Sequence, residues 1–184
     1  MKACTSFVAI DLEMTSAHLH TGRIIEVGLA RYIDGQLTED YERLINPNEP
    51  VPEAVTELTG IRDEDLSGCP VFSQVIDEII DFCGGYPLLG HNVEIDYAFL
   101  RQEACYIGQT KRFKCKGMDT LRISRKLIDG GSHRLPDLCK KLSIETEGSH
   151  RALSDAHAAA GLYFTLLANY EAGSYGNAKD GDNF

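Results

Sequence analysis

The chain has 184 residues, of which 43% are hydrophobic and 25% are charged, a composition typical of a globular domain with a sizeable core. No apolar run approaches the roughly 20 residues that cross a bilayer, so we expect no contact with a membrane. The first residues lack the pattern of a signal peptide, which favours a cytoplasmic location. The six cysteines include no C-x-x-C pair, so neither a disulfide framework nor a zinc site is expected.

Charge is distributed unevenly along the chain. The net charge of −10 at pH 7 argues at first against a polyanionic partner. Acidic residues dominate residues 1–100, however, whereas lysine and arginine are concentrated in "KRFKCKGMDTLRISRK" (111–126). Such a run is either a solvated helix face or a contact for phosphate groups, and the sequence leaves both interpretations open.

The first third of the chain is predicted to form strands. Residues 4–14 are the most apolar segment and predict a strand at the centre of a sheet. Residues 23–33 predict a second strand, and the Asp-Gly pair in 34–36 is a strong signal for a hairpin turn. Residues 37–45 follow as a third strand, which is more polar and is expected at an edge.

Helical patterns dominate the rest of the chain. We predict helices over 53–58, 71–83, 93–105, 119–128, 135–142 and 152–169, with short strands at 86–91 and near 114–118. An antiparallel meander followed by alternating helices and strands predicts an α/β fold, a mixed five-stranded sheet whose last strands run parallel and whose faces carry helices. Residues 1–170 are expected to form one domain, and the polar segment 171–184 a flexible tail.

Two carboxylates, Asp11 and Glu13, interrupt the apolar first strand. On a strand, residues two apart point to the same face, so these side chains project together while Leu12 and Met14 point to the other face. Two buried like charges repel each other, and a divalent cation is a natural compensator because hard cations prefer carboxylate oxygens. The alternative is that both side chains face water at the edge of the sheet.

Three further residues are candidates for the same site. Asp96 lies in the first turn of a predicted helix, where an acid is also favoured by helix capping. Asp155 lies near the start of the apolar C-terminal helix, five residues after His150. Within one helix these two would point about 140° apart. They can converge only if His150 lies before the helix; otherwise it is a capping or surface histidine.

Three segments in this order carry a specific resemblance. "IDLE" (10–13), "GHNVEIDYAFL" (90–100) and "HRALSDA" (150–156) resemble the three motifs of the DEDDh, or DnaQ-like, 3′–5′ exonucleases. The resemblance covers roughly residues 6–168 and is strongest to the proofreading exonucleases of bacterial DNA polymerase III. It implies a ribonuclease H-like fold, in agreement with the mixed sheet predicted above.

The resemblance also implies roles for single residues. Asp11, Glu13, Asp96 and Asp155 match the four acidic ligands of two divalent cations, Mg²⁺ or Mn²⁺, with Asp11 bridging both ions. His150 matches the general base that activates the attacking water. The implied activity removes nucleoside 5′-monophosphates one at a time from a 3′ end.

Substrate contacts and the choice of nucleic acid are less closely defined. We expect Leu12, Met14, Thr15, His91 and Asn92 near the terminal nucleotide. The commoner first motif of the family reads D-x-E-T-T-G, whereas "DLEMTS" is closer to the oligoribonuclease branch, which has a tyrosine where this chain has His150. DNA ends are therefore the leading substrate and short or structured RNA is the alternative, with a non-catalytic nucleic-acid-binding scaffold as a third possibility. Proofreading would require a DNA polymerase partner in trans.

Overall fold

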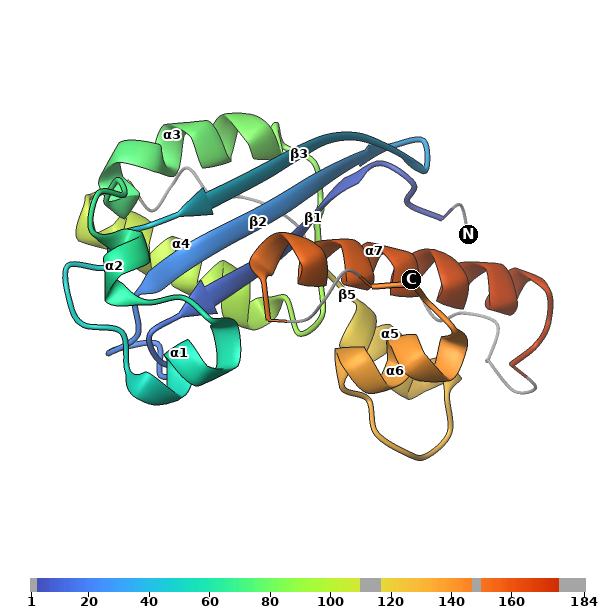
Figure 1. Cartoon of the computed structure of the whole chain (residues 1–184). Coiled ribbons are helices and arrows are strands. Elements are labelled where there is room, and N and C mark those ends of the chain that lie inside the picture. Colours follow the sequence, from blue (N-terminus) through green and yellow to red (C-terminus); the bar gives the residue numbers. More distant parts are fainter. Residues whose placement is uncertain (1–2, 110–116, 147–149, 176–184) are drawn as a thin grey trace.

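The computed structural model describes residues 3–109, 117–146 and 150–175, and its centre is a five-stranded sheet with helices on both faces (Figure 1). The spatial order of the strands is β3-β2-β1-β4-β5, so the most apolar strand lies in the middle, as predicted. β1 pairs antiparallel with β2, which pairs antiparallel with β3, whereas β4 is parallel to β1 and β5 is parallel to β4. The strands are β1 Phe7–Met14, β2 Ile24–Ile33, β3 Gln36–Leu44, β4 Leu88–Gly90 and β5 Gly117–Asp119. The predicted mixed sheet is confirmed.

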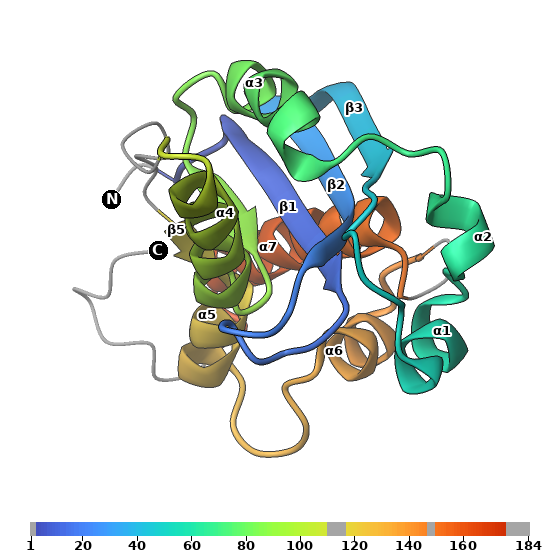
Figure 2. The same cartoon turned by 90° about the vertical axis from the view of Figure 1, so that its left-hand side faces the viewer.

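The helices account for most of the chain after β3. Figure 2 shows α3 and α4 on one side of the sheet and α7 on the other, with α5 and α6 beside α7. The bounds are α1 Glu53–Thr59, α2 Asp63–Leu66, α3 Phe72–Cys83, α4 Glu94–Tyr106, α5 Thr120–Leu127, α6 Leu135–Leu142 and α7 Ala152–Glu171. No helix in these described ranges is long and apolar enough to cross a bilayer.

The hairpin between β2 and β3 explains where β1 begins. Asp34 and Gly35 both have positive φ, 50° and 80°, which is the backbone of a two-residue turn that matches strand twist. The residues before β1 are hydrogen-bonded to this turn. The Gly35 N–H donates to the Thr5 carbonyl at 2.8 Å, and the Asp34 N–H donates to the Ser6 hydroxyl at 3.0 Å. The strand therefore starts at Phe7, and the prediction of a start at residue 4 was wrong.

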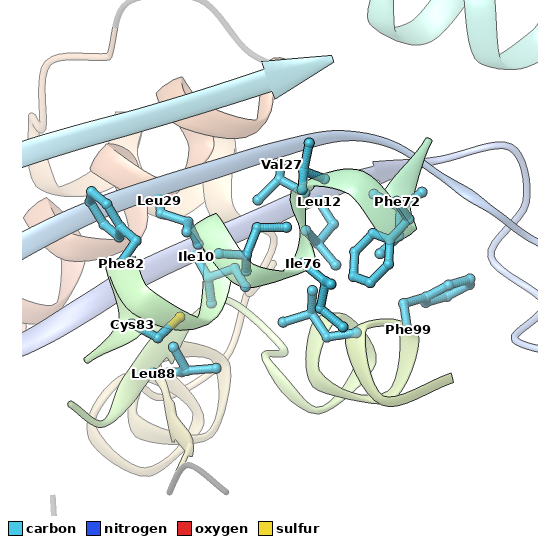
Figure 3. Packing of buried hydrophobic residues seen from close by; sticks show 14 of the residues in the cluster. Ile10, Leu12, Val27, Leu29, Phe72, Ile76, Phe82, Cys83, Leu88 and Phe99 are labelled. Carbon is cyan, nitrogen blue, oxygen red and sulfur yellow. The ribbon is translucent and has the colours of Figure 1, made fainter. Parts of the chain in front are cut away.

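Successive side chains of β1 point alternately into two hydrophobic cores, one on each face of the sheet. Val8, Ile10 and Leu12 pack against α3 and α4 (Figure 3), whereas Phe7 and Ala9 face the helices on the side of α7. The acids of β1 continue the second series, so they point toward α7 and away from Ile10 and Leu12. The period of two that the sequence predicted for this strand is confirmed.

Most other boundaries lie within two residues of the prediction, with two exceptions. The short helix α2 was not predicted, because four residues carry no helical period; the Arg62 N–H donates to the Asp65 carboxylate at its start. The strand expected near 114–118 is β5, and residues 114–116 lie outside the described residues. The same holds for residues 176–184 of the expected tail, whereas α7 continues to Glu171.

Candidate active site

Three of the predicted carboxylates meet on the α7 side of the sheet. Asp11 and Glu13 lie in the second half of β1, and Asp155 lies in the first turn of α7. One oxygen from each lies within 4.8 Å of the others, and all three side chains are shielded from most solvent. Residues 142 positions apart in sequence thus form one cluster, which is the geometry that a divalent cation with oxygen ligands needs.

Gly28 lets α7 approach the sheet closely enough to form this cluster. Gly28 pairs with Asp11 in the β1–β2 ladder. A Cβ atom at Gly28 would lie 2.1 Å from the Leu153 nitrogen and 2.2 Å from the Ala152 carbonyl carbon. The backbone of the first turn of α7 therefore rests directly on β2, at the strand position next to Asp11. Only a residue without a side chain fits there.

A buried ion pair fixes the start of the same helix. Glu26, on β2 opposite Glu13, is fully buried, and its carboxylate accepts from Arg151 Nη2 at 2.6 Å and Arg151 Nε at 3.0 Å. It also accepts from the Ala152 N–H at 2.9 Å, one of the backbone donors that a helix leaves unpaired at its first turn. Neither Glu26 nor Arg151 was predicted from the sequence. An acid inside the apolar segment "RIIEVG" (23–28) is nevertheless a signal for a buried charge with a partner.

His150 lies before α7, as convergence with Asp155 requires. Its backbone has φ of 63°, in the left-handed region, and its N–H donates to Asp155 Oδ2 at 3.0 Å. The left-handed conformation of His150 and its hydrogen bond to Asp155 hold the two residues next to each other. The histidine is partly buried at the edge of the carboxylate cluster.

Asp96 lies beside the cluster and outside the set of three. It occupies the first turn of α4 and is 6% exposed. The backbone N–H of Leu12 lowers the pKa of Asp96, against the effect of burial, and the charge of Asp96 raises the pKa of Asp11. The Asp96 carboxylate therefore lies near β1 and near Asp11. The four acids thus form an inner trio and one neighbour held by a different helix.

Burial raises the pKa of every acid in this group, and repulsion by neighbouring acids adds to the shift for Asp11, Glu13 and Asp96. The pKa of Asp11 is well above its ordinary value, first because of burial and then because of Asp96 and Glu13. Burial and the charge of Asp155 raise the pKa of Glu13 to about 7, and burial raises that of Asp96 to about 8. Burial also raises the pKa of Asp155, opposed by its hydrogen bond and proximity to His150. Such a group ionises readily only when cations neutralise it.

His91 and Asn92 connect the cluster to the neighbouring strand. His91 Nδ1 lies 2.9 Å from Thr120 Oγ1 and Nε2 lies 2.8 Å from the His133 carbonyl oxygen, so both ring nitrogens have protein partners. Burial lowers the pKa of His91. Asn92 has φ of 73° and its N–H donates to Asp119 Oδ1 at 2.9 Å. These bonds fix the turn that leads into α4 and Asp96.

The three residues of the first motif that were expected near the terminal nucleotide, Leu12, Met14 and Thr15, lie wholly or partly inside the protein. Leu12 is 3% exposed and belongs to the core under α3 and α4, and Met14 packs against that core while remaining partly accessible. Thr15 is buried; its hydroxyl donates to Glu49 at 2.8 Å and accepts from the Arg23 N–H at 2.9 Å. Of the basic run 111–126, residues 111–116 lie outside the described residues.

Comparison with known proteins places these motifs in a family. The sequence matches the family described as exonuclease over residues 8–163. It is 32% identical to DNA polymerase III subunit epsilon of Aquifex aeolicus over 180 residues, which is 95% of this chain and 88% of that protein. It is 34% identical to DNA polymerase III PolC-type of Halalkalibacterium halodurans over 166 residues, 89% of this chain but only 11% of that larger protein.

Solved structures show the same fold at lower sequence identity. The nuclease domain of 3′hExo, a DEDDh family member solved with bound rAMP, matches with a TM-score of 0.77 and 19% identity over 90% of this chain and 92% of that chain. Exonuclease X in complex with 5′ overhanging duplex DNA matches with a TM-score of 0.74 and 20% identity over 89% and 92%. The predicted ribonuclease H-like fold is confirmed. The chain therefore belongs to the exonuclease family, as a 3′–5′ exonuclease of the DEDDh (DnaQ-like) type.

Proposed function

We propose that this chain hydrolyses DNA from the 3′ end, at single-stranded or frayed termini, and releases nucleoside 5′-monophosphates. The observation that carries the proposal is the convergence of Asp11, Glu13 and Asp155 within 4.8 Å, with Asp96 held beside Asp11. The likeness to the epsilon subunit and the PolC-type polymerase supports DNA as the substrate. It also supports a DNA polymerase as a partner in trans and a place in the cytoplasm.

The four acids fit two divalent cations, Mg²⁺ or Mn²⁺. Asp11, Glu13 and Asp155 would hold one ion, and Asp96 together with Asp11 would hold the second. The raised pKa values support this assignment, because buried carboxylates that repel one another are stabilised by a bound cation and prefer hard ones. Bound cations supply an acidified water and neutralise charge on the attacking and leaving oxygens.

His150 would act as the general base. A neutral imidazole can take the proton of the attacking water. The hydrogen bond between the His150 N–H and Asp155 keeps this residue at the trio, and the left-handed backbone turns the chain before α7 begins. Met14 is partly accessible beside the first motif, so we place it near the terminal nucleotide, together with Asn92. Leu12, Thr15 and His91 are held by contacts inside the protein and would support this side of the site from behind.

A second candidate function is trimming of RNA by the same chemistry. It is favoured by Met14 and Ser16, which stand where the commoner first motif has Thr and Gly. Discrimination between the sugars depends on contacts to the 2′ position. A digestion assay with matched DNA and RNA strands decides between the two.

The test uses 5′-labelled DNA and RNA oligomers of equal sequence with Mg²⁺ or Mn²⁺. We expect a ladder of DNA products that shortens one nucleotide at a time and stops when EDTA is added. Asp11→Asn should reduce cleavage by at least about a thousandfold while the thermal unfolding temperature does not fall. Asp129→Asn, on the exposed loop after α5, is the matched control and should cleave normally. Faster trimming of RNA would select the second function, and a folded protein that cuts neither strand with either metal would select a binding scaffold.

A further inference from the structure

A groove between the turn after β4 and the connection from α5 to α6 lies next to the carboxylates and has no role so far. Its volume is about 500 Å³, within the range of ligand-binding clefts, and its walls include His91, Asn92, Arg125, Ser132, His133 and Arg134. Figure 1 shows α5 and α6 below α7. The groove is built from the segments that follow β4 and β5 in the chain.

The topology places this groove near the candidate active site. β1, β4 and β5 run parallel, so the chain segments that follow their carboxyl ends meet at one edge of the sheet. Asn92 donates its N–H to Asp119, and the charge of Asp119 acts on the pKa of Asp96. His91 in the same wall acts on the pKa of Asp155. A strand whose end lies at the acids therefore reaches the groove within a short distance.

The two arginines of the groove differ from most others in the protein. Arg23, Arg31, Arg43, Arg122 and Arg151 each lie against a carboxylate. Arg125 and Arg134 form no ion pair with any residue in the described part of the chain, and both are exposed. A guanidinium without an internal partner is free to bind an anion, and its planar fork matches a phosphate.

His91 and His133 support the walls instead of facing the ligand. The His91 ring bonds Thr120 and the His133 carbonyl, and His133 Nδ1 lies 3.0 Å from the Ser124 hydroxyl. These bonds connect the turn after β4, α5 and the loop before α6, so the backbone segments that carry the two arginines are held in place. The walls of the groove are thus preorganised, which lowers the entropic cost of binding.

We propose that this groove binds the phosphodiester backbone of the substrate strand on the 5′ side of the scissile bond, with Arg125 and Arg134 as the phosphate contacts. The proposal rests on the proposed function for the direction of the strand. It explains how a chain of net charge −10 accepts a polyanion: the positive contacts are concentrated where the strand leaves the acids.

Binding is measured by fluorescence anisotropy with a 5′-labelled strand of about 12 thymidines, within the site sizes of single-strand binders. Ca²⁺ replaces Mg²⁺, and a gel confirms that the strand stays intact. For the double variant R125A/R134A we expect affinity to fall about tenfold and the slope of log affinity against log salt to become shallower by about 0.7 for each lost phosphate contact. Lys140→Ala, which removes one exposed positive charge on α6 outside the groove, is the control and should leave the slope unchanged.

A second substrate separates the groove from the reaction itself. The p-nitrophenyl ester of thymidine 5′-monophosphate has no upstream phosphate, so R125A/R134A should hydrolyse it within about twofold of the unmodified protein. Unchanged affinity and salt slope, an equal loss in Lys140→Ala, or an equal loss on the ester would each overturn the proposal. If the unmodified protein cuts neither ester nor strand, the proposed function fails, while the anisotropy titration still decides whether the groove binds a strand.

Discussion

Glu13 and Glu26 face each other across β1 and β2, yet their surroundings are opposite. Glu26 is fully buried, and its carboxylate accepts three hydrogen bonds from Arg151 and one from the Ala152 N–H. Glu13 lies among Asp11 and Asp155, and its pKa is raised to about 7 by burial, Asp155 and Glu26. One acid of the pair is neutralised by the protein, and the other is not.

This difference indicates what each acid does. Glu26 is compensated, which means that Arg151 and the Ala152 N–H neutralise its buried charge, and it holds the start of α7 against β2. The uncompensated carboxylates repel one another until protons or a bound cation neutralise them, which is typical of a binding site. The compensated pair also sets the geometry of the other group, because Arg151 lies between His150 and the helix that carries Asp155.

The largest effect is expected where α7 touches β2. Gly28→Ala places a methyl group 2.1 Å from the Leu153 nitrogen, a backbone atom that cannot move without the helix. We expect the free energy of unfolding to fall by about 3 kcal/mol. We also expect cleavage to fall by at least about a hundredfold, because Asp155 moves away from Asp11. Urea unfolding and the digestion assay measure the two effects.

Gly68 supplies the matched control for this substitution. A Cβ atom at Gly68 has no neighbour within 4 Å, and its φ is not positive. Gly68→Ala should therefore change stability by less than about 0.5 kcal/mol and leave cleavage intact. If Gly28→Ala behaves like Gly68→Ala, the close contact between α7 and β2 does not position the acids.

Glu26→Gln tests the compensated acid directly. The amide keeps the shape of the side chain but loses the charge that Arg151 and the Ala152 N–H require. Because Arg151 is about half exposed, at 48%, we expect a loss of about 2 kcal/mol in stability, below the range for fully buried pairs. Cleavage should fall by about tenfold through displacement of His150 and Asp155.

Glu42→Gln is the control, since Glu42 also contacts Arg151, at 3.3 Å, but is 43% exposed. Exposed ion pairs contribute little, so this variant should lose less than about 0.5 kcal/mol. To distinguish positioning from stability alone, binding of Mn²⁺ is measured by electron paramagnetic resonance on folded protein. Glu26→Gln should weaken it and Glu42→Gln should not; equal Mn²⁺ binding in both would show that the buried pair serves only the fold.

Sequence periodicity predicted β1 and the face of the sheet to which Asp11 and Glu13 point. It failed where the structure depends on contacts between residues far apart in the sequence. The period of two placed Asp11 and Glu13 on one face, and helical phase indicated that His150 can converge with Asp155 only if it precedes α7. Gly28 is different, because its need to lack a side chain arises from a helix far along the sequence. The partnership of Glu26 with Arg151, 125 residues later, is equally invisible to periodicity. The separation of Asp96 from the trio depends on how α4 packs, which no local pattern fixes.

The smallest effect, counted per pH unit, concerns the pH dependence of the metal-free protein. Burial raises the folded-state pKa of Glu13 to about 7 and that of Asp96 to about 8, above their unfolded values. The folded state then binds more protons than the unfolded state between about pH 5 and pH 8, so stability falls as pH rises through this window. In EDTA we expect the free energy of unfolding to fall by on the order of 1 kcal/mol per pH unit.

Two controls connect this slope to the uncompensated acids. Asp96→Asn removes one of the titrating groups and should make the slope shallower, whereas Glu42→Gln should leave it unchanged. Millimolar Mn²⁺ should reverse the trend, because cations bind the deprotonated carboxylates and stabilise the folded state more as pH rises. A metal-free protein that becomes more stable from about pH 5 to pH 8 would mean that these acids are already neutralised within the fold, as Glu26 is, and the contrast between the two groups of acids would be lost.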